Sequence, residues 1–135
     1  MEMIAVLRWM FPGLDASMMA GRTQVFADRI GWWDDALGAQ PTPAEIAAAE
    51  LPAAKAIKTA ANRAECERRI YARYPAGRQS SVALGIYSGA EAEAQAAIMK
   101  DWISDMVAAE NAAADAIEAA QTVQQVEAVT VTWPT

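Results

Sequence analysis

The chain has 135 residues, which fits one ordinary domain and leaves no room for a second substantial one. It contains no histidine and one cysteine, Cys66, which excludes a Ser-His-Asp triad, a histidine acid or base, the common zinc sites and an intramolecular disulfide. The net charge of −6 disfavours a general nucleic-acid binder, because contacts with phosphates dominate such affinity.

The first forty residues combine a short helical pattern with strand-forming residues. Met3 to Met10 is predicted to form an amphipathic helix that Pro12-Gly13 ends. This apolar stretch is too short to span a bilayer, carries Arg8 and lacks the pattern of a signal peptide. We therefore expect a soluble protein made in the cytoplasm. From Thr23 to Asp34, β-branched and aromatic residues favour strands.

A long helix is predicted to follow. Thr42-Pro43-Ala44-Glu45 is a capping box with proline at the first helical position. Pro52 removes a backbone hydrogen bond, so we expect a kink or break near Leu51 before the helix resumes. Tyr74-Pro75 should end it, because a residue before proline avoids the helical conformation. Residues 76–87 are predicted to be a connecting loop with at most one short turn.

A second long helix is predicted from the capping box Ser88-Gly89-Ala90-Glu91. We expect Trp102 and Ile98 to pack near the loop against Ile70 or Tyr71. Further along, Thr122 with Gln125 predicts a short capped turn. The expected apolar face of the second helix, at alternating steps of three and four, comprises Met99, Trp102, Met106, Ala109, Ala113, Ala116 and Ala120, flanked by Ile98, Ile103, Val107 and Ile117.

The alternation of Val129, Val131 and Trp133 with threonines predicts a strand that ends at Pro134. An isolated strand would be unstable, so its expected partner is the extended part of the N-terminal region.

Composition and charge indicate how the two long helices pair. Thirty-three residues are alanine, which favours helices packed closely around a thin core. From Lys55 to Arg78, seven basic residues and two acidic ones give +5; from Glu91 to Glu118, one basic and seven acidic residues give −6. Pairing the two segments relieves both self-repulsions, which favours an antiparallel hairpin. The expected fold is mainly α, an antiparallel helical hairpin with a small N- and C-terminal β or irregular region.

This organisation predicts three regions. Residues 1–40 form an N-terminal interaction region of a short helix and strands, residues 41–121 the alanine-rich hairpin, and residues 122–135 a C-terminal turn and strand.

No set of residues predicts catalysis, a metal site or a cofactor. Asp34-Asp35 is interpreted as a solvated or capping pair, and Ser80-Ser81 as part of a polar loop without a histidine to activate it. Asp101 and Asp105 fit a solvated helix face. Glu65 and Glu67 would raise the pKa of Cys66, so it is read as a small helix residue. The cluster of Arg68, Arg69, Arg73 and Arg78 is interpreted as facing the acidic helix and solvent.

Aromatic residues are the best candidates for a binding surface. The rings of Trp32 and Trp33 cannot share one face of a strand, which makes one of them a candidate for a protein interface. The candidate interface residues are Trp9, Phe11, Phe26, Trp32, Trp33 and Trp133.

Several segments, taken in order, resemble small proteins encoded among the tail and tail-fibre genes of tailed bacteriophages, including the XkdW-type tail proteins and tail-fibre assembly proteins. The chain departs from their pattern at Gly77 and Arg78, where relatives usually have an aromatic residue and a lysine. The similar segments are Trp32-Trp33, the run Pro41-Thr42-Pro43-Ala44-Glu45-Ile46, Lys55-Ala56-Ile57-Lys58, the run Arg69-Ile70-Tyr71-Ala72-Arg73-Tyr74-Pro75 with Gln79, and Thr130-Val131-Thr132-Trp133-Pro134.

The resemblance implies a non-enzymatic protein that acts as a fibre assembly chaperone and/or a minor tail subunit, in the virion tail and/or the host cytoplasm during assembly. Its implied partner is a tail-fibre or baseplate protein, with several copies arranged around a trimeric fibre. We expect neither nucleic acid nor a membrane as a partner. The alternative is an unrelated helical interaction module, such as a bacterial adaptor. An enzyme is disfavoured by the missing histidine.

Overall fold

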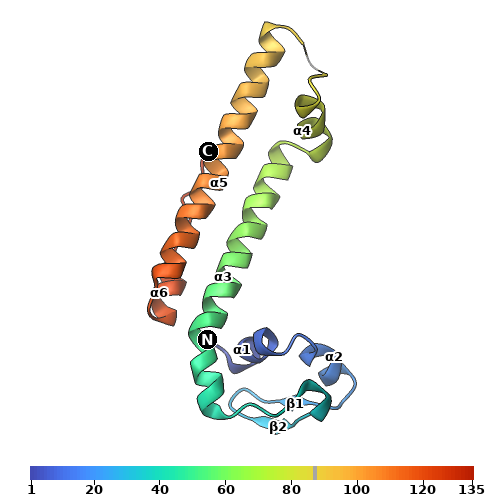
Figure 1. The fold of residues 1–135 in the computed structure, drawn as a ribbon, viewed down its shortest axis with the longest axis vertical. Coiled ribbons are helices and arrows are strands. Elements are labelled where there is room, and N and C mark those ends of the chain that lie inside the picture. Colours follow the sequence, from blue (N-terminus) through green and yellow to red (C-terminus); the bar gives the residue numbers. More distant parts are fainter. Residues whose placement is uncertain (87) are drawn as a thin grey trace. The chain divides into compact units, whose positions relative to one another are not determined.

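The computed structural model describes residues 1–86 and 88–135 of the protein (Figure 1). Contacts divide the chain into two compact units. We name residues 1–57 and 120–127 the N-terminal unit, and residues 58–119 and 128–135 the hairpin unit. Helices dominate, which confirms the mainly α fold class. No helix within the described ranges has the length and apolar character needed to cross a membrane.

The N-terminal unit begins with two short helices. Helix α1, Met3–Met10, has the predicted bounds and buries Val6 and Leu7. Helix α2, Leu14–Met19, was not predicted and buries Leu14. Gly21 follows the end of α2, and its φ of +71° allows its N–H to bond the Met18 carbonyl at 3.0 Å while the N–H of Arg22 bonds the Ser17 carbonyl at 2.9 Å.

The predicted strands between Thr23 and Asp34 are present but short. Strand β1, Gln24–Val25, pairs antiparallel with β2, Ile30–Trp32, and the Phe26 N–H bonds the Arg29 carbonyl across the turn. The expected pairing with the C-terminal segment is therefore wrong. A tight turn brings two neighbouring segments together at a smaller loop-closure cost than a partner a hundred residues away. The 3₁₀ helix η1, Asp35–Leu37, follows.

Helix α3, Pro43–Arg73, begins at the predicted capping box. The Thr42 N–H bonds Glu45 Oε2 at 2.7 Å, and the Glu45 N–H bonds Thr42 Oγ1 at 3.2 Å. Of the kink or break expected near Leu51, the break is wrong, because α3 continues through Pro52. Pro52 and the residue four positions earlier, Ala48, are both exposed, so water can reach the carbonyl that the proline leaves without a donor.

The predicted connecting loop contains a helix of eight residues, α4, Ala76–Ala83. The Pro75 carbonyl accepts the N–H groups of Arg78 and Gln79, so the proline that ends α3 also begins α4. Gly85, with a φ of +67°, ends α4 with the same pair of hydrogen bonds that closes α2. The last predicted loop residue, Tyr87, lies outside the described residues.

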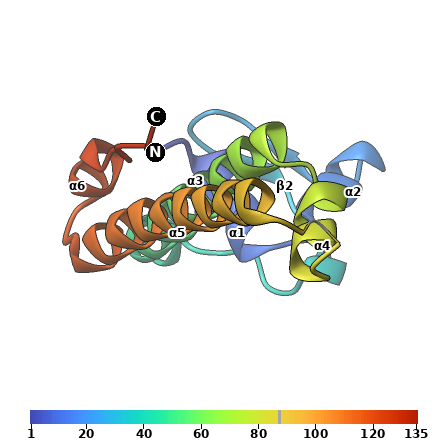
Figure 2. The ribbon, with the colours of Figure 1, turned by 90° about the horizontal axis from the view of Figure 1, so that it is seen from above.

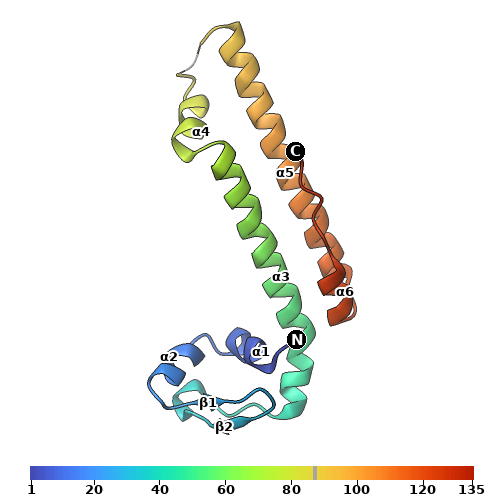
Figure 3. The same cartoon turned by 180° about the vertical axis from the view of Figure 1, so that it is seen from behind.

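Helix α5, Ala90–Ala119, runs antiparallel to the part of α3 that belongs to the hairpin unit, which confirms the predicted helical hairpin (Figures 1 and 3). It begins at Ala90, two residues after the predicted cap Ser88, and the Gly89 carbonyl accepts the Glu93 N–H. Helix α4 lies beside the N-terminal half of α5 (Figure 2). The buried cluster of the hairpin unit contains Cys66, Ile70 and Met106, with Trp102, Ile103 and Trp133 packed against it.

The buried face of α5 differs from the predicted face by a small rotation. Met99, Met106 and Ala113 are buried as predicted. Ala116 is exposed, whereas Ile117, which was expected beside the seam, is buried. Ile98 is exposed, so the expected packing near the loop holds for Trp102 but is wrong for Ile98.

Helix α6, Val123–Ala128, has the predicted cap, because the Gln125 N–H bonds Thr122 Oγ1 at 3.1 Å. The strand predicted at Val129 to Trp133 is wrong, since these residues form no regular secondary structure. The segment runs back along the hairpin unit (Figure 3), and Trp133 packs against the helices there. The apolar side chains of this segment therefore pack on helices instead of in a sheet.

Candidate interaction surface

The best-connected polar group of the N-terminal unit is the carboxylate of Asp34. It accepts hydrogen bonds from the Ala36 N–H at 3.0 Å, from Ser17 Oγ at 2.9 Å and from Arg22 Nε at 2.9 Å. Ser17 is also within 2.7 Å of Thr23 Oγ1, which accepts the Asp34 N–H at 3.1 Å. The bonds from Ala36, Arg22 and Ser17 lower the pKa of Asp34. The capping role predicted for the Asp34-Asp35 pair is confirmed for Asp34, and the network ties α2 to η1.

The tryptophan pair faces two directions, as predicted. Trp33 packs edge-on against Phe11 with ring centroids 4.8 Å apart, and its indole N–H bonds the Gly38 carbonyl at 2.9 Å. Trp32 is 53% exposed, and its indole N–H bonds the Gly21 carbonyl at 3.2 Å. Trp33 and Phe11 therefore support the fold, while Trp32 presents a fixed ring to solvent.

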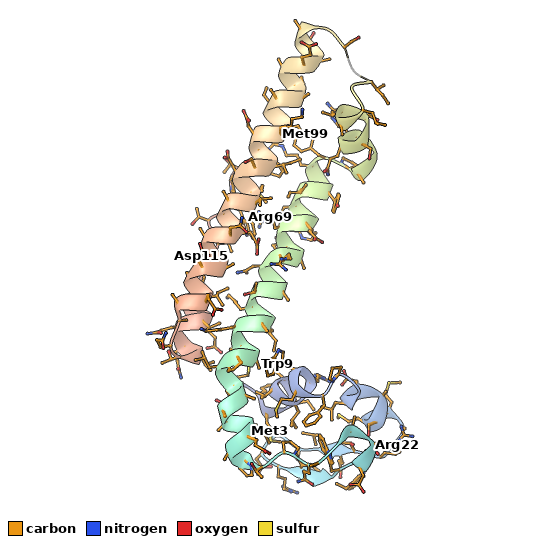
Figure 4. All side chains as sticks on the ribbon, in the orientation of Figure 1. Met3, Trp9, Arg22, Arg69, Met99 and Asp115 are labelled. Carbon is orange, nitrogen blue, oxygen red and sulfur yellow. The ribbon has the colours of Figure 1, made fainter. Side chains whose placement is uncertain are left out.

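Two other candidate residues of this unit are exposed. Trp9, labelled on α1 in Figure 4, is 42% exposed. Phe26, in the turn between β1 and β2, is 37% exposed. The guanidinium of Arg29 lies 4.3 Å from the centre of the Phe26 ring. A Cβ atom on Gly31 would lie 2.8 Å from Phe26 Cε2, so the absence of a side chain at Gly31 lets the Phe26 ring lie over β2.

Two shallow hollows flank Met3 and Ala27, which line both of them. The larger hollow, of about 440 Å³, lies between the β1–β2 turn and the first turns of α3, and Glu50 lines it. The smaller, of about 300 Å³, is lined by Glu2 and by apolar side chains from α1 and β1. Both are mainly apolar depressions in a unit that also exposes aromatic rings.

In the hairpin unit, the arginines bind their own helix and aromatic rings. Glu65 accepts Arg68 Nε at 2.7 Å and Arg69 Nε at 2.6 Å, and these arginines lower the pKa of Glu65 to about 2. The Arg69 guanidinium also lies 5.3 Å from the centre of the Trp133 ring. The Arg73 guanidinium lies 4.5 Å from the centre of the Trp102 ring. Arg69 and Arg73 therefore pack on indoles.

The six candidate interface residues thus separate into two groups. Trp9, Phe26 and Trp32 are exposed on the N-terminal unit. Phe11 and Trp33 pack on each other, and Trp133 packs against the hairpin cluster. Whether any of them contacts a partner stays a prediction.

The remaining candidates from the sequence are two exposed carboxylates, a serine of α4 and the buried cysteine. Asp101 and Asp105 are exposed, as predicted. Ser81 lies on α4 and donates to the Gly77 carbonyl at 2.9 Å. Cys66 is 5% exposed. Burial raises the pKa of its thiol, and the negative charges of Glu110 and Glu67 raise that pKa further. Within residues 1–86 and 88–135, no three potential metal-binding side chains of His, Cys, Asp or Glu cluster together.

The burial of Glu110 on α5 was not predicted from the sequence. One carboxylate oxygen of Glu110 and the side-chain nitrogen of Asn62 are buried without a hydrogen-bond partner among the described residues. Glu110 lies four residues from Met106 and three from Ala113, so the helical period places it on the buried face despite its charge. The helical periodicity of the sequence alone could have identified Glu110 as a buried residue.

No protein-family model matches the chain, and neither a curated protein nor a solved structure shows significant similarity to it.

Proposed function

We propose that this protein is a non-enzymatic bacteriophage tail protein that associates with the tail fibre. It acts as a fibre assembly chaperone and/or as a minor structural subunit, in the host cytoplasm during assembly and/or in the virion tail. The proposed partner is a tail-fibre or baseplate protein. The sequence segments that resemble small phage tail proteins support this assignment, and the exposed aromatic side chains supply a surface for it.

The observation that carries the proposal is the exposure of Trp9, Phe26 and Trp32 within one small unit. Single exposed apolar residues are ordinary on protein surfaces, but aromatic rings are enriched among the residues that dominate binding energy. The hydrogen bond from the Trp32 indole to the Gly21 carbonyl holds the ring in one orientation. A ring fixed before binding loses little conformational entropy when a partner covers it.

The test is co-expression of the affinity-tagged full-length chain with the fibre protein encoded beside it, followed by calorimetric titration of the purified pair. Trp32→Ala is expected to weaken binding about thirtyfold, the loss that corresponds to about 2 kcal/mol for an interface anchor. The matched control is Tyr71→Ala, because Tyr71 is a 52% exposed aromatic residue in the hairpin unit. It should leave the affinity unchanged.

Two results would count against this assignment. Unchanged affinity for Trp32→Ala, or a loss no larger than that for Tyr71→Ala, would show that the exposed aromatic rings of the N-terminal unit are not the specific contact. Absence of any complex with fibre or baseplate proteins, together with a stable complex with a cellular protein, would favour the helical adaptor instead.

A further inference from the structure

Residues 129–135, which we name the C-terminal strap, lie on the hairpin unit without joining a helix or a sheet. Exposure alternates along the strap: Val129, Val131 and Trp133 are half-buried, whereas Thr130 and Thr132 are exposed. This is the pattern of an extended segment with one face against a surface. The surface here consists of helices.

One side chain makes the strap's clearest contacts. The Trp133 ring packs against the cluster of Cys66, Ile70 and Met106, and the Arg69 guanidinium lies 5.3 Å from its centre. Arg69 is itself fixed by its 2.6 Å hydrogen bond to Glu65. The hydrogen bond to Glu65 therefore holds the Arg69 guanidinium beside the indole ring of Trp133.

The next residue favours the same arrangement. Pro134 disfavours a helical conformation at Trp133, so the strap is biased towards an extended form before it docks. A segment that belongs to no helix or sheet can detach without unfolding the helices beneath it, because local openings cost less free energy than global unfolding.

We infer that the hairpin face formed by Cys66, Ile70, Met106 and Arg69 is a binding site for an extended peptide segment that carries an indole side chain, and that the strap is its detachable occupant in this structure. A partner segment with apolar residues at alternate positions and a Trp-Pro pair has the chemistry to replace the strap. This inference does not rest on the proposed tail function, because it uses contacts of the hairpin unit alone.

Cys66 reports whether the strap is docked, because it is the chain's single cysteine and is 5% exposed within the cluster that Trp133 packs against. The experiment measures the rate at which a thiol reagent modifies Cys66 in the folded full-length protein. Trp133→Ala should raise that rate about tenfold or more, and Trp133→Phe should give an intermediate rate, since it keeps an aromatic ring. Trp32→Ala, in the N-terminal unit, should not change it.

A second control separates release of the strap from unfolding of the hairpin. Met99→Ala removes a buried side chain of α5 that is not part of the cluster under Trp133. It should lower the urea midpoint but accelerate the modification of Cys66 far less than Trp133→Ala does. If Met99→Ala accelerates the modification as much, Cys66 is reached by unfolding and the detachable strap is refuted.

The binding site is tested by supplying the occupant from outside. A synthetic peptide with the sequence of residues 129–135 should slow the modification of Cys66 in the Trp133→Ala protein. The same peptide with alanine in place of tryptophan should not. Lack of protection by the tryptophan peptide, with circular dichroism showing an intact helical protein, would overturn the proposed site.

Discussion

At the scale of single residues, Asp34 shows how one carboxylate organises the N-terminal unit. Its three hydrogen bonds join a buried serine, an arginine and the first turn of η1. These bonds favour the charged form and therefore lower the pKa of Asp34 from its usual value of 3.8. A carboxylate whose pKa is lower in the folded state stabilises the fold above the unfolded-state value, and this contribution is lost as the pH falls through the folded-state pKa.

We predict that Asp34→Asn lowers the urea midpoint at about pH 7, and that the difference from the unsubstituted protein shrinks as the pH falls below about 3.8. Asparagine keeps the shape of the side chain but removes the charge. Urea titrations at several pH values test this. Asp35→Asn is the control, because Asp35 is exposed and should give a small difference throughout. A difference for Asp34→Asn that does not vary with pH would contradict a stabilising role of the charge.

At the scale of whole elements, α3 tolerates a proline in its interior. Proline at position 52 lacks the N–H that would bond the carbonyl four residues earlier, and its ring crowds that carbonyl. The helix nevertheless continues, because the capping box fixes its start and both Ala48 and Pro52 are exposed to water. Pro43 stands in the first turn of the same helix, where an N–H would have no partner within the helix.

Comparison of these two prolines gives a prediction. Pro52→Ala should stabilise the protein by up to about 3 kcal/mol, because it restores the hydrogen bond and relieves the crowding. Pro43→Ala should change the free energy of unfolding by no more than about 0.5 kcal/mol. Urea denaturation measures both. A destabilised Pro52→Ala protein would mean that the proline shapes α3 in a way that the packing requires.

At the scale of the molecule, the two units alternate along the chain. The N-terminal unit and the hairpin unit each combine two separate stretches of sequence, and helix α3 contributes to both. Each unit has its own buried side chains, with Leu14 fully buried in the first and Met106 fully buried in the second. Separate cores favour separate local openings.

We therefore predict that Leu14→Ala and Met106→Ala affect different amides. Leu14→Ala should accelerate hydrogen exchange mainly between residues 3 and 37, and Met106→Ala mainly in the hairpin unit, since each leaves a cavity in its own core. Mass spectrometry of peptic fragments resolves the two regions. If both substitutions accelerate exchange equally across the whole chain, the units open together and the prediction fails.

Features that depend on neighbouring residues could be predicted from the amino-acid sequence. The capping boxes at Thr42 and Thr122 predicted helix starts because their hydrogen bonds join residues three positions apart. The alternation from Val129 to Trp133 wrongly predicted a strand, although the exposure of these side chains does alternate as the sequence does. The hairpin followed from two long helical patterns of opposite charge.

The residues that cover each helix or strand face could not be predicted in the same way, because they come from other parts of the fold. The tertiary structure placed the strap on helices and buried Ile117 in place of Ala116, because these outcomes depend on contacts between residues far apart in the sequence. The same holds for the candidate surface: the sequence identified six aromatic residues, but packing against Phe11 or the hairpin cluster decided which of them are covered. Side chains of one type differ in exposure when their neighbours in space differ.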